Sequence, residues 1–250
     1  MMYMRTLGLV GVVAVAVVVL VVGEILVARN RSYLVDVPFA VDRTIGPSTD
    51  DREPLELRVL GDSTAAGVGT DAADDALPSL LAERVARRTG RAVHVVGSGV
   101  SGARTADLTT DQLQKVDSAD VIVIVVGSND VIHVTTPRRL RRQTAALLEE
   151  AAATGVPVVL GGIPRFYGVG ALAQPLRSIA DGYAAVLRDV QRDVAASISD
   201  VTFVDIAALA SPRFRGVPES MSSDEFHPST VGYGFWADAL APAVVAAVRS

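Results

Sequence analysis

Two kinds of hydrophobic pattern follow one another along this chain from Leu55 onward. Short runs of Val, Ile and Leu predict buried strands, and longer stretches with apolar residues every three or four positions predict amphipathic helices. The predicted strands are Leu55–Leu60, Ala92–Val96, Asp120–Val126, Val156–Leu160 and Val201–Asp205. The predicted helices are Leu77–Arg88, Asp107–Val116, Arg138–Ala153, Leu172–Ser197 and Ser229–Val248.

Strands that alternate with helices indicate an α/β fold with a parallel sheet and helices on both faces. The run VIVIVV at 121–126 has no polar position, as expected for a central strand that is covered on both sides. We therefore expect a three-layer α/β/α sandwich with a parallel five-stranded sheet. In such sheets ligands bind beyond the carboxyl ends of the strands.

The N-terminal stretch has a different pattern, with no charge from Thr6 to Gly23. At about 1.5 Å per residue, a helix of this length just spans a hydrocarbon core of about 30 Å. We expect residues 1–28 to be a transmembrane signal anchor. A signal peptide is the alternative, with a passable cleavage site at Val21-Val22-Gly23. Residues 29–54 mix charges, prolines and short apolar pieces, and we interpret them as a linker before a domain at 55–250.

This interpretation places the protein at the cell membrane, single-pass with an extracytoplasmic catalytic domain, or outside the cell after signal cleavage. Arg5 favours a cytoplasmic N-terminus, while Arg29 and Arg31 oppose it. The net charge of −5 argues against nucleic acid as a partner, because binding a phosphate backbone needs a basic face. The absence of cysteine excludes disulfides, thiolate metal sites and cysteine nucleophiles.

Three of the predicted strands end in polar turns that contain glycine: GDS at 61–63, GSGVSGART at 97–105 and GSND at 127–130. Gly, Asp and Ser are also ordinary turn residues, so one such turn would carry no functional meaning. Three of them at one edge of the sheet indicate a site. Ser63 is then the expected nucleophile, and Ser101 is the one rival hydroxyl nearby.

A serine nucleophile needs a general base, which is usually a histidine oriented by a third group. The chain has three histidines. His94 lies within a predicted strand, and His133 follows GSND and either lines the pocket or serves the loop. His227 lies in the polar loop SSDEFHPSTVGY, three residues after Asp224. We therefore expect His227 as the base and Asp224 as its partner.

The negative charge of a tetrahedral intermediate needs hydrogen-bond donors that are already in place. Three candidates are available at the strand ends: the backbone N–H of Ser63, the backbone N–H of Gly102 and the side-chain amide of Asn129. These three groups form the predicted oxyanion hole.

GDS, the SG of residues 101–102, GSND and DEFH occur in this order from Leu55 to Ser250, and together they resemble the SGNH/GDSL hydrolases. The resemblance implies a flavodoxin-like sandwich, Ser63, Asp224 and His227 as catalytic residues, Gly102 and Asn129 as oxyanion-hole donors, and no metal or organic cofactor. One departure is Gly97-Ser98-Gly99, where many relatives carry an asparagine; it puts the local support of the loop in question.

The sequence thus predicts a serine ester hydrolase, an esterase or lipase that acts through an acyl-enzyme on lipid or on acylated envelope carbohydrate. An acyltransferase that uses the same acyl-enzyme is one alternative. A non-catalytic envelope-binding module is another, because a fold does not by itself define a function.

Overall fold

A six-stranded sheet forms the centre of the molecule in the computed structural model, which describes residues 2–37, 39–47, 52–113, 116 and 118–249. The strand order is β1-β3-β2-β4-β5-β6, and every neighbouring pair is parallel except β1 with β3. The strands are β1 (Asp42–Ile45), β2 (Leu55–Gly61), β3 (Val93–Gly99), β4 (Val121–Val125), β5 (Val158–Gly161) and β6 (Val201–Val204). The predicted α/β sandwich and its five parallel strands are confirmed, and β1 is an additional edge strand.

Helices cover both faces of this sheet. The longer ones after the N-terminus are α3 (Leu77–Thr89), α4 (Thr105–Asp111), α6 (Pro137–Ala152), α7 (Leu176–Ala195) and α9 (Thr230–Ala247). The short ones are α2 (Ser63–Ala66), α5 (Ser128–Ile132) and α8 (Ile206–Leu209), with 3-10 turns η1 (Ala73–Asp75), η3 (Ser211–Phe214) and η4 (Pro218–Ser220).

The central strand β4 supplies both halves of the core. Val121, Val123 and Val125 pack with residues of α3 and α9, whereas Ile122 and Ile124 pack with residues of α4, α6 and α7. Successive side chains of a strand point to opposite faces, so an unbroken apolar run is the pattern that a doubly covered strand requires.

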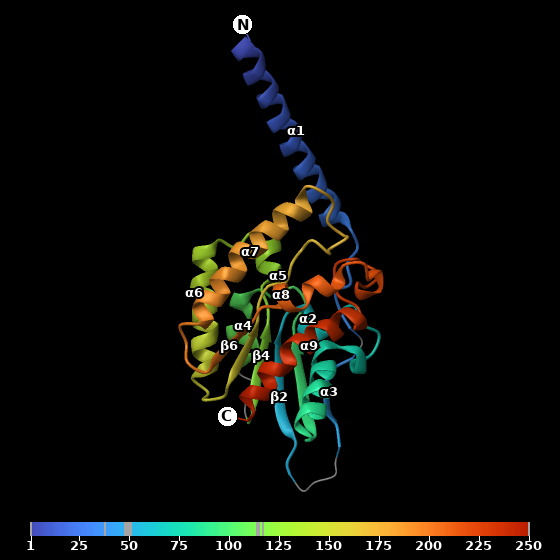
Figure 1. Ribbon diagram of the computed structural model, residues 1–250, viewed down its shortest axis with the longest axis vertical. Coiled ribbons are helices and arrows are strands. Elements are labelled where there is room, and N and C mark those ends of the chain that lie inside the picture. The colour runs from blue at the N-terminus through green and yellow to red at the C-terminus, as the bar shows by residue number, and fades with distance from the viewer. Residues whose placement is uncertain (1, 38, 48–51, 114–115, 117, 250) are drawn as a thin grey trace.

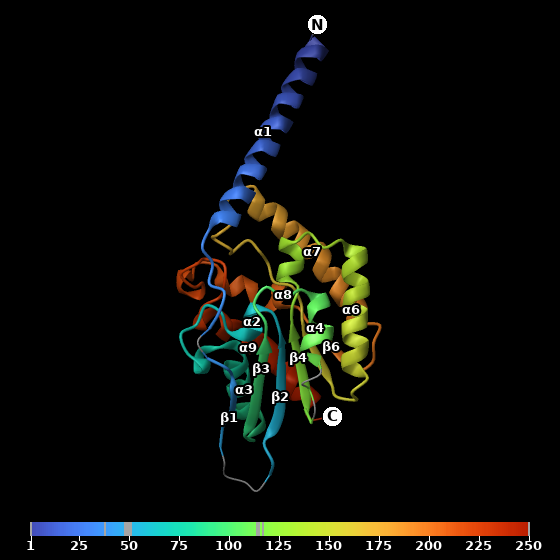
Figure 2. The same cartoon turned by 180° about the vertical axis from the view of Figure 1, so that it is seen from behind.

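The carboxyl ends of the parallel strands meet at one end of the molecule. Gly61 of β2 pairs with Gly99 of β3 and with Val125 of β4, so the turns that follow these three strands start side by side. The short helices α2, α5 and α8 lie at this end, which is also the end nearer α1 (Figures 1 and 2).

The first helix, α1 (Met2–Asn30), projects away from the body of the molecule, and only its last part approaches it (Figure 1). Its side chains are described from Val15 onward. No helix in the described part of the chain is long and apolar enough to cross a membrane. The predicted membrane anchor is therefore not supported.

The stretch predicted as a linker packs against the domain over part of its length. Val41 is 3% exposed and belongs to the core beneath α3, with Phe39 packed beside it. Residues 42–45 then form β1 along β3. Positions 1, 38, 48–51, 114, 115, 117 and 250, which fall within the predicted N-terminal segment, linker, second helix and domain, lie outside the described residues.

His94 connects this edge strand to the sheet. Its Nδ1 lies 2.8 Å from Glu56 Oε2 on β2, and its Nε2 lies 2.9 Å from Asp42 Oδ1 on β1. Hydrogen bonds to Glu56 and then Asp42 raise the pKa of His94 above its ordinary value. Arg58 also lies 2.9 Å from Glu56 and pairs with the same carboxylate.

We predict that His94→Gln destabilises the protein more in acid than in base. A raised histidine pKa contributes stability in full below the unfolded-state value of about 6.5, and this stability is lost as the pH rises through the folded-state value. Because the groups are partly exposed, we expect at most about 1 kcal/mol. Thermal unfolding of the wild type and the variant at pH 5.5 and pH 9 measures this loss of stability. The same loss at both pH values would contradict the prediction.

Candidate active site

Ser63 is the first residue of α2 and lies two residues after the end of β2 at Gly61. Asp62 caps this short helix, because its Oδ1 accepts the backbone N–H of Thr64 at 2.9 Å. Asp62 and Ser63 are 2% and 7% exposed. The capping carboxylate holds the turn, and the turn holds the Ser63 hydroxyl at the end of the sheet.

Gly99 allows α2 to sit directly on β3. A Cβ on this residue would lie 2.0 Å from the backbone nitrogen of Ala66 and 2.6 Å from the carbonyl oxygen of Asp62. No side chain fits at so short a distance. The glycine-rich departure from the family pattern at 97–99 therefore has a structural role, because it lets the helix that carries Ser63 pack against the neighbouring strand.

Gln112 holds the end of β2 in a way that the sequence analysis missed. Its amide nitrogen donates to Gly61 O and its amide oxygen accepts from Gly61 N–H, both at 2.8 Å. Gln112 is 2% exposed. The side chain thus pairs with the backbone as a neighbouring strand would, directly before Asp62 and Ser63. A lone Gln near the end of a predicted helix carries no motif that would reveal this.

The three predicted catalytic side chains form one hydrogen-bonded chain. Ser63 Oγ lies 3.1 Å from His227 Nε2, and His227 Nδ1 lies 2.7 Å from Asp224 Oδ2. His227 and Asp224 are each 6% exposed. The loop of Asp224 and His227 comes before α9, whose N-cap Ser229 lies two residues after the histidine.

Asp224 accepts hydrogen bonds on both of its carboxylate oxygens. Oδ1 accepts from the Ser222 hydroxyl at 2.8 Å and from the backbone N–H groups of Phe226 and His227 at 2.8 and 2.9 Å. Burial alone would raise the pKa of Asp224, but the donors from His227, Phe226 and Ser222 outweigh it and hold the pKa well below its usual range. Asp224 is therefore an anion that orients the histidine.

The predicted oxyanion-hole donors lie on turns that are joined to each other. Asn129 Nδ2 donates to Ala103 O at 3.0 Å, which leaves its second amide hydrogen outside this bond. Asp130 Oδ2 accepts from both the backbone N–H and the hydroxyl of Thr105. Gly102 adopts a φ of +81°, a left-handed conformation that favours glycine.

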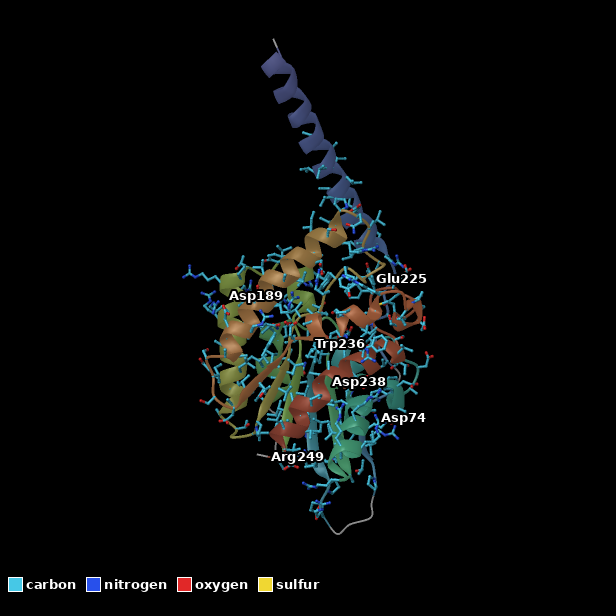
Figure 3. All side chains as sticks on the ribbon, in the orientation of Figure 1. Asp74, Asp189, Glu225, Trp236, Asp238 and Arg249 are labelled. Atoms are coloured by element: carbon cyan, nitrogen blue, oxygen red, sulfur yellow. The ribbon has the colours of Figure 1, made fainter. Side chains whose placement is uncertain are left out.

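An apolar cavity of about 60 Å³ lies beside Ser63 and His227. Its walls are rich in aromatic side chains, namely Phe166, Tyr167, Phe214, Phe226 and Trp236. Trp236, which is labelled in Figure 3, also belongs to the hydrophobic core on the α9 side of the sheet, so it contributes to both the core and the cavity wall.

One wall of this cavity is the segment 164–169 that follows β5. Arg165 forms a two-pronged ion pair with Asp181 of α7, with nitrogen–oxygen distances of 2.9 and 2.6 Å. The same carboxylate accepts the backbone N–H of Phe166 at 2.7 Å. The Tyr167 hydroxyl donates to Ser211 O. These contacts make the wall a fixed part of the site.

The remaining candidates from the sequence lie elsewhere. His94 belongs to the β1 contact, and the exposed His133 bonds through Nδ1 to Asn129 O at 2.8 Å. Ser101 is not among the residues that line the cavity, and its hydroxyl is not the one bonded to His227. The structure therefore brings Ser63, and not Ser101, to His227.

Comparison with known proteins supports the resemblance to the SGNH/GDSL hydrolases. Residues 59–235 match the family model of the GDSL-like lipase/acylhydrolases. GDSL-like esterase Rv1075c of Mycobacterium tuberculosis is 30% identical over 190 residues, which cover 74% of this chain and 60% of that protein. The chain thus spans less than two thirds of the length of this curated relative.

Solved structures show the same fold. The lipase/acylhydrolase from Enterococcus faecalis has a TM-score of 0.61 at 23% identity, with 77% of this chain and 96% of that chain covered. The lipase Lip_vut3 from a goat rumen metagenome has a TM-score of 0.61 at 20% identity, with 76% and 97% covered. The chain belongs to the GDSL-like lipase/acylhydrolase family.

We predict that Asp62→Asn stabilises the protein at pH 8. Burial, with the Asp130 carboxylate adding to it, raises the pKa of Asp62 to about 6 from 3.8, although hydrogen bonds from Thr64 oppose the shift. The folded protein then holds a proton that the unfolded chain releases, so stability falls as the pH rises from about 4 to 6. Two pKa units correspond to roughly 3 kcal/mol at most.

Asparagine keeps the cap on Thr64 N–H without the charge, so the gain should vanish as the pH falls toward 4. Urea unfolding of the wild type and the variant at pH 4 and pH 8 measures this gain in stability. A variant that is less stable than the wild type at pH 8 would show that the ionised carboxylate is a net stabiliser of the turn.

Proposed function

We propose that this protein is a serine esterase that cleaves esters of short acyl groups through an acyl-enzyme on Ser63. The observation that carries the proposal is the hydrogen-bonded chain Ser63–His227–Asp224 at the mouth of an apolar cavity. The family to which the chain belongs supports ester hydrolysis as the reaction class.

In the proposed reaction, Ser63 Oγ attacks the ester carbonyl while His227 Nε2 accepts its proton. The imidazolium is stabilised by the Asp224 carboxylate on its other nitrogen. His227 then gives the proton to the departing alkoxide, which leaves as the alcohol. A water molecule then attacks the acyl-enzyme carbonyl while His227 accepts its proton, and the acid is released as His227 gives this proton back to Ser63 Oγ. The N–H groups of Ser63 and Gly102 and the Asn129 amide stabilise the oxyanion in both steps.

The size and character of the cavity support a short acyl group. The cavity beside Ser63 measures only about 60 Å³, which favours a short acyl chain. Its aromatic walls suit an uncharged acyl chain, because burying a charge beside them has a high desolvation cost. We therefore propose acetyl to butyryl esters as the substrates, rather than esters of long-chain lipids.

We predict that activity on p-nitrophenyl esters falls from acetyl or butyryl to palmitoyl and is lost in Ser63→Ala. Loss of a triad member should lower kcat by about 10⁴-fold or more. Activity that peaks on palmitoyl would contradict the short-acyl proposal, and equal activity of wild type and variant would contradict Ser63 as nucleophile.

Two further measurements test the alternatives. Labelling of Ser63 by an organophosphonate is expected of an enzyme and not of a binding module. Product analysis with added sugar or lipid hydroxyls distinguishes hydrolysis from transfer, and acyl transfer that exceeds hydrolysis would make the protein an acyltransferase. A place in the cell envelope, with acylated carbohydrate as the ester donor, stays a prediction.

We predict that Asn129→Ala lowers kcat by about 10²–10³-fold with little change in KM. A donor to the oxyanion acts in the transition state more than in the bound ester. Steady-state kinetics on the best ester measures it. His133→Ala, a change at an exposed neighbour on the same turn, is the control and should keep nearly full activity. A variant with raised KM and unchanged kcat would place Asn129 in substrate binding instead.

A further inference from the structure

The N-terminal segment Arg31–Leu34 lies across the loop that carries Asp224 and His227. This segment is far outside the matched family region of 59–235. We propose that it is a positioning element of the active site, which holds the Asp224–His227 pair in its productive geometry. The inference rests on the proposed serine esterase mechanism.

Three consecutive residues of the loop each contact this segment. The backbone N–H of Leu34 donates to Asp224 Oδ2 at 3.1 Å. Arg31 forms an ion pair with Glu225 at 2.5 Å. The ring of Tyr33 packs edge-on against Phe226, with centroids 5.1 Å apart, and Phe226 in turn packs against the His227 ring at 5.0 Å.

The contact with Asp224 reaches the reacting groups most directly. Leu34 N–H and His227 Nδ1 bond to the same carboxylate oxygen, Oδ2. This donor fixes the rotation of the carboxylate and withdraws charge from the oxygen that faces the imidazole. Burial raises the pKa of Tyr33, the Arg31 guanidinium opposes this shift, and the nearby Asp224 carboxylate adds to it, in agreement with a segment packed closely on the pair.

The ion pair between Arg31 and Glu225 holds a residue whose backbone is strained. Glu225 has a φ of +55°, a left-handed conformation that costs free energy in a residue with a Cβ and persists only where the surroundings impose it. Its carbonyl accepts the backbone N–H of Ala171 at 3.1 Å, and its side chain pairs with Arg31. Figure 3 shows Glu225 beside the base of α1. The N-terminal segment thus helps to impose the loop conformation.

The segment is itself held at its start by the end of α1. Glu24 accepts the backbone N–H of Leu176, the first residue of α7, at 2.8 Å. Ala28 packs against the cluster that contains Ile163, Phe166 and Leu172. Because Phe166 also lines the acyl cavity, α1 contacts the same part of the protein that forms the site.

Leu34→Pro in the full chain removes the N–H donor to Asp224. We expect kcat to fall about tenfold, the loss that one hydrogen bond to a charged group implies, with KM nearly unchanged. Val35→Pro is the matched control, because it introduces the same ring one residue later, at an exposed position, and leaves the Leu34 N–H in place.

The pH profile separates positioning from a loss of fold. Without the Leu34 donor, Asp224 carries more charge toward the imidazolium, so the acidic limb of kcat/KM should move to higher pH. A purely structural defect would lower activity at every pH without moving this limb. The other titratable groups near Asp224 are Tyr33, Tyr233 and the Arg31–Glu225 ion pair at the next residue of the loop.

A double-mutant cycle tests the ion pair. Arg31→Ala and Glu225→Ala should each lower kcat about threefold, and the double variant should lose no more than either single one, because both remove the same interaction. Arg31→Lys should restore most of the activity. Arg29→Ala, a loss of charge at an exposed neighbour, is the control.

The outcomes distinguish this inference from the proposed mechanism. If Ser63→Ala abolishes activity while Leu34→Pro and Arg31→Ala match the wild type in kcat and pH profile, the segment has no positioning role and the mechanism stands. If Ser63→Ala keeps full activity, the mechanism fails and the inference fails with it. Additive effects of Arg31→Ala and Glu225→Ala would contradict the role of the ion pair.

Discussion

The carboxylate of Asp224 is the interaction on which the site depends. A charge this deeply buried is stable only when donors surround it, and five hydrogen bonds do so: three on Oδ1 and two on Oδ2. The donors come from its own loop, from the histidine and from the N-terminal segment. Satisfying one anion therefore fixes the loop conformation, the tautomer and ring orientation of His227, and the path of residues 31–34.

The serine side of the site depends on the ends of parallel strands. The regular hydrogen bonding between strands stops where the strands end, but the buried backbone N–H and C=O groups there still need hydrogen-bond partners. Two glutamines provide them. Gln112 pairs with both backbone groups of Gly61, and Gln191 of α7 donates to Val126 O and accepts from Ile163 N–H. The turns that carry Ser63 and the cavity wall thus start from fixed positions.

The N-terminal segment extends the functional unit beyond the part of the chain that matches the family model. Residues 29–54 look like a linker because they lack periodicity, yet they supply an edge strand, core contacts at Val41 and a donor to Asp224. Each of these uses backbone groups or single side chains, for which hydrophobic patterning has no signal. The family region begins at residue 59, but the polar contacts of the site extend to residue 31.

The sequence by itself determined the class of fold and predicted the candidate catalytic groups that the structure brings together. Strand and helix periodicity is local, and the turns after β2, β3 and β4 had to meet because parallel strands share one edge. The tertiary structure alone decided the surroundings of these groups: the apolar cavity, the Gln112 pairing, the fit at Gly99 and the contact of Leu34 with Asp224. These features join residues up to 190 positions apart. The physical reason is that packing and hydrogen bonding depend on distance in space, whereas a sequence pattern records only neighbours along the chain.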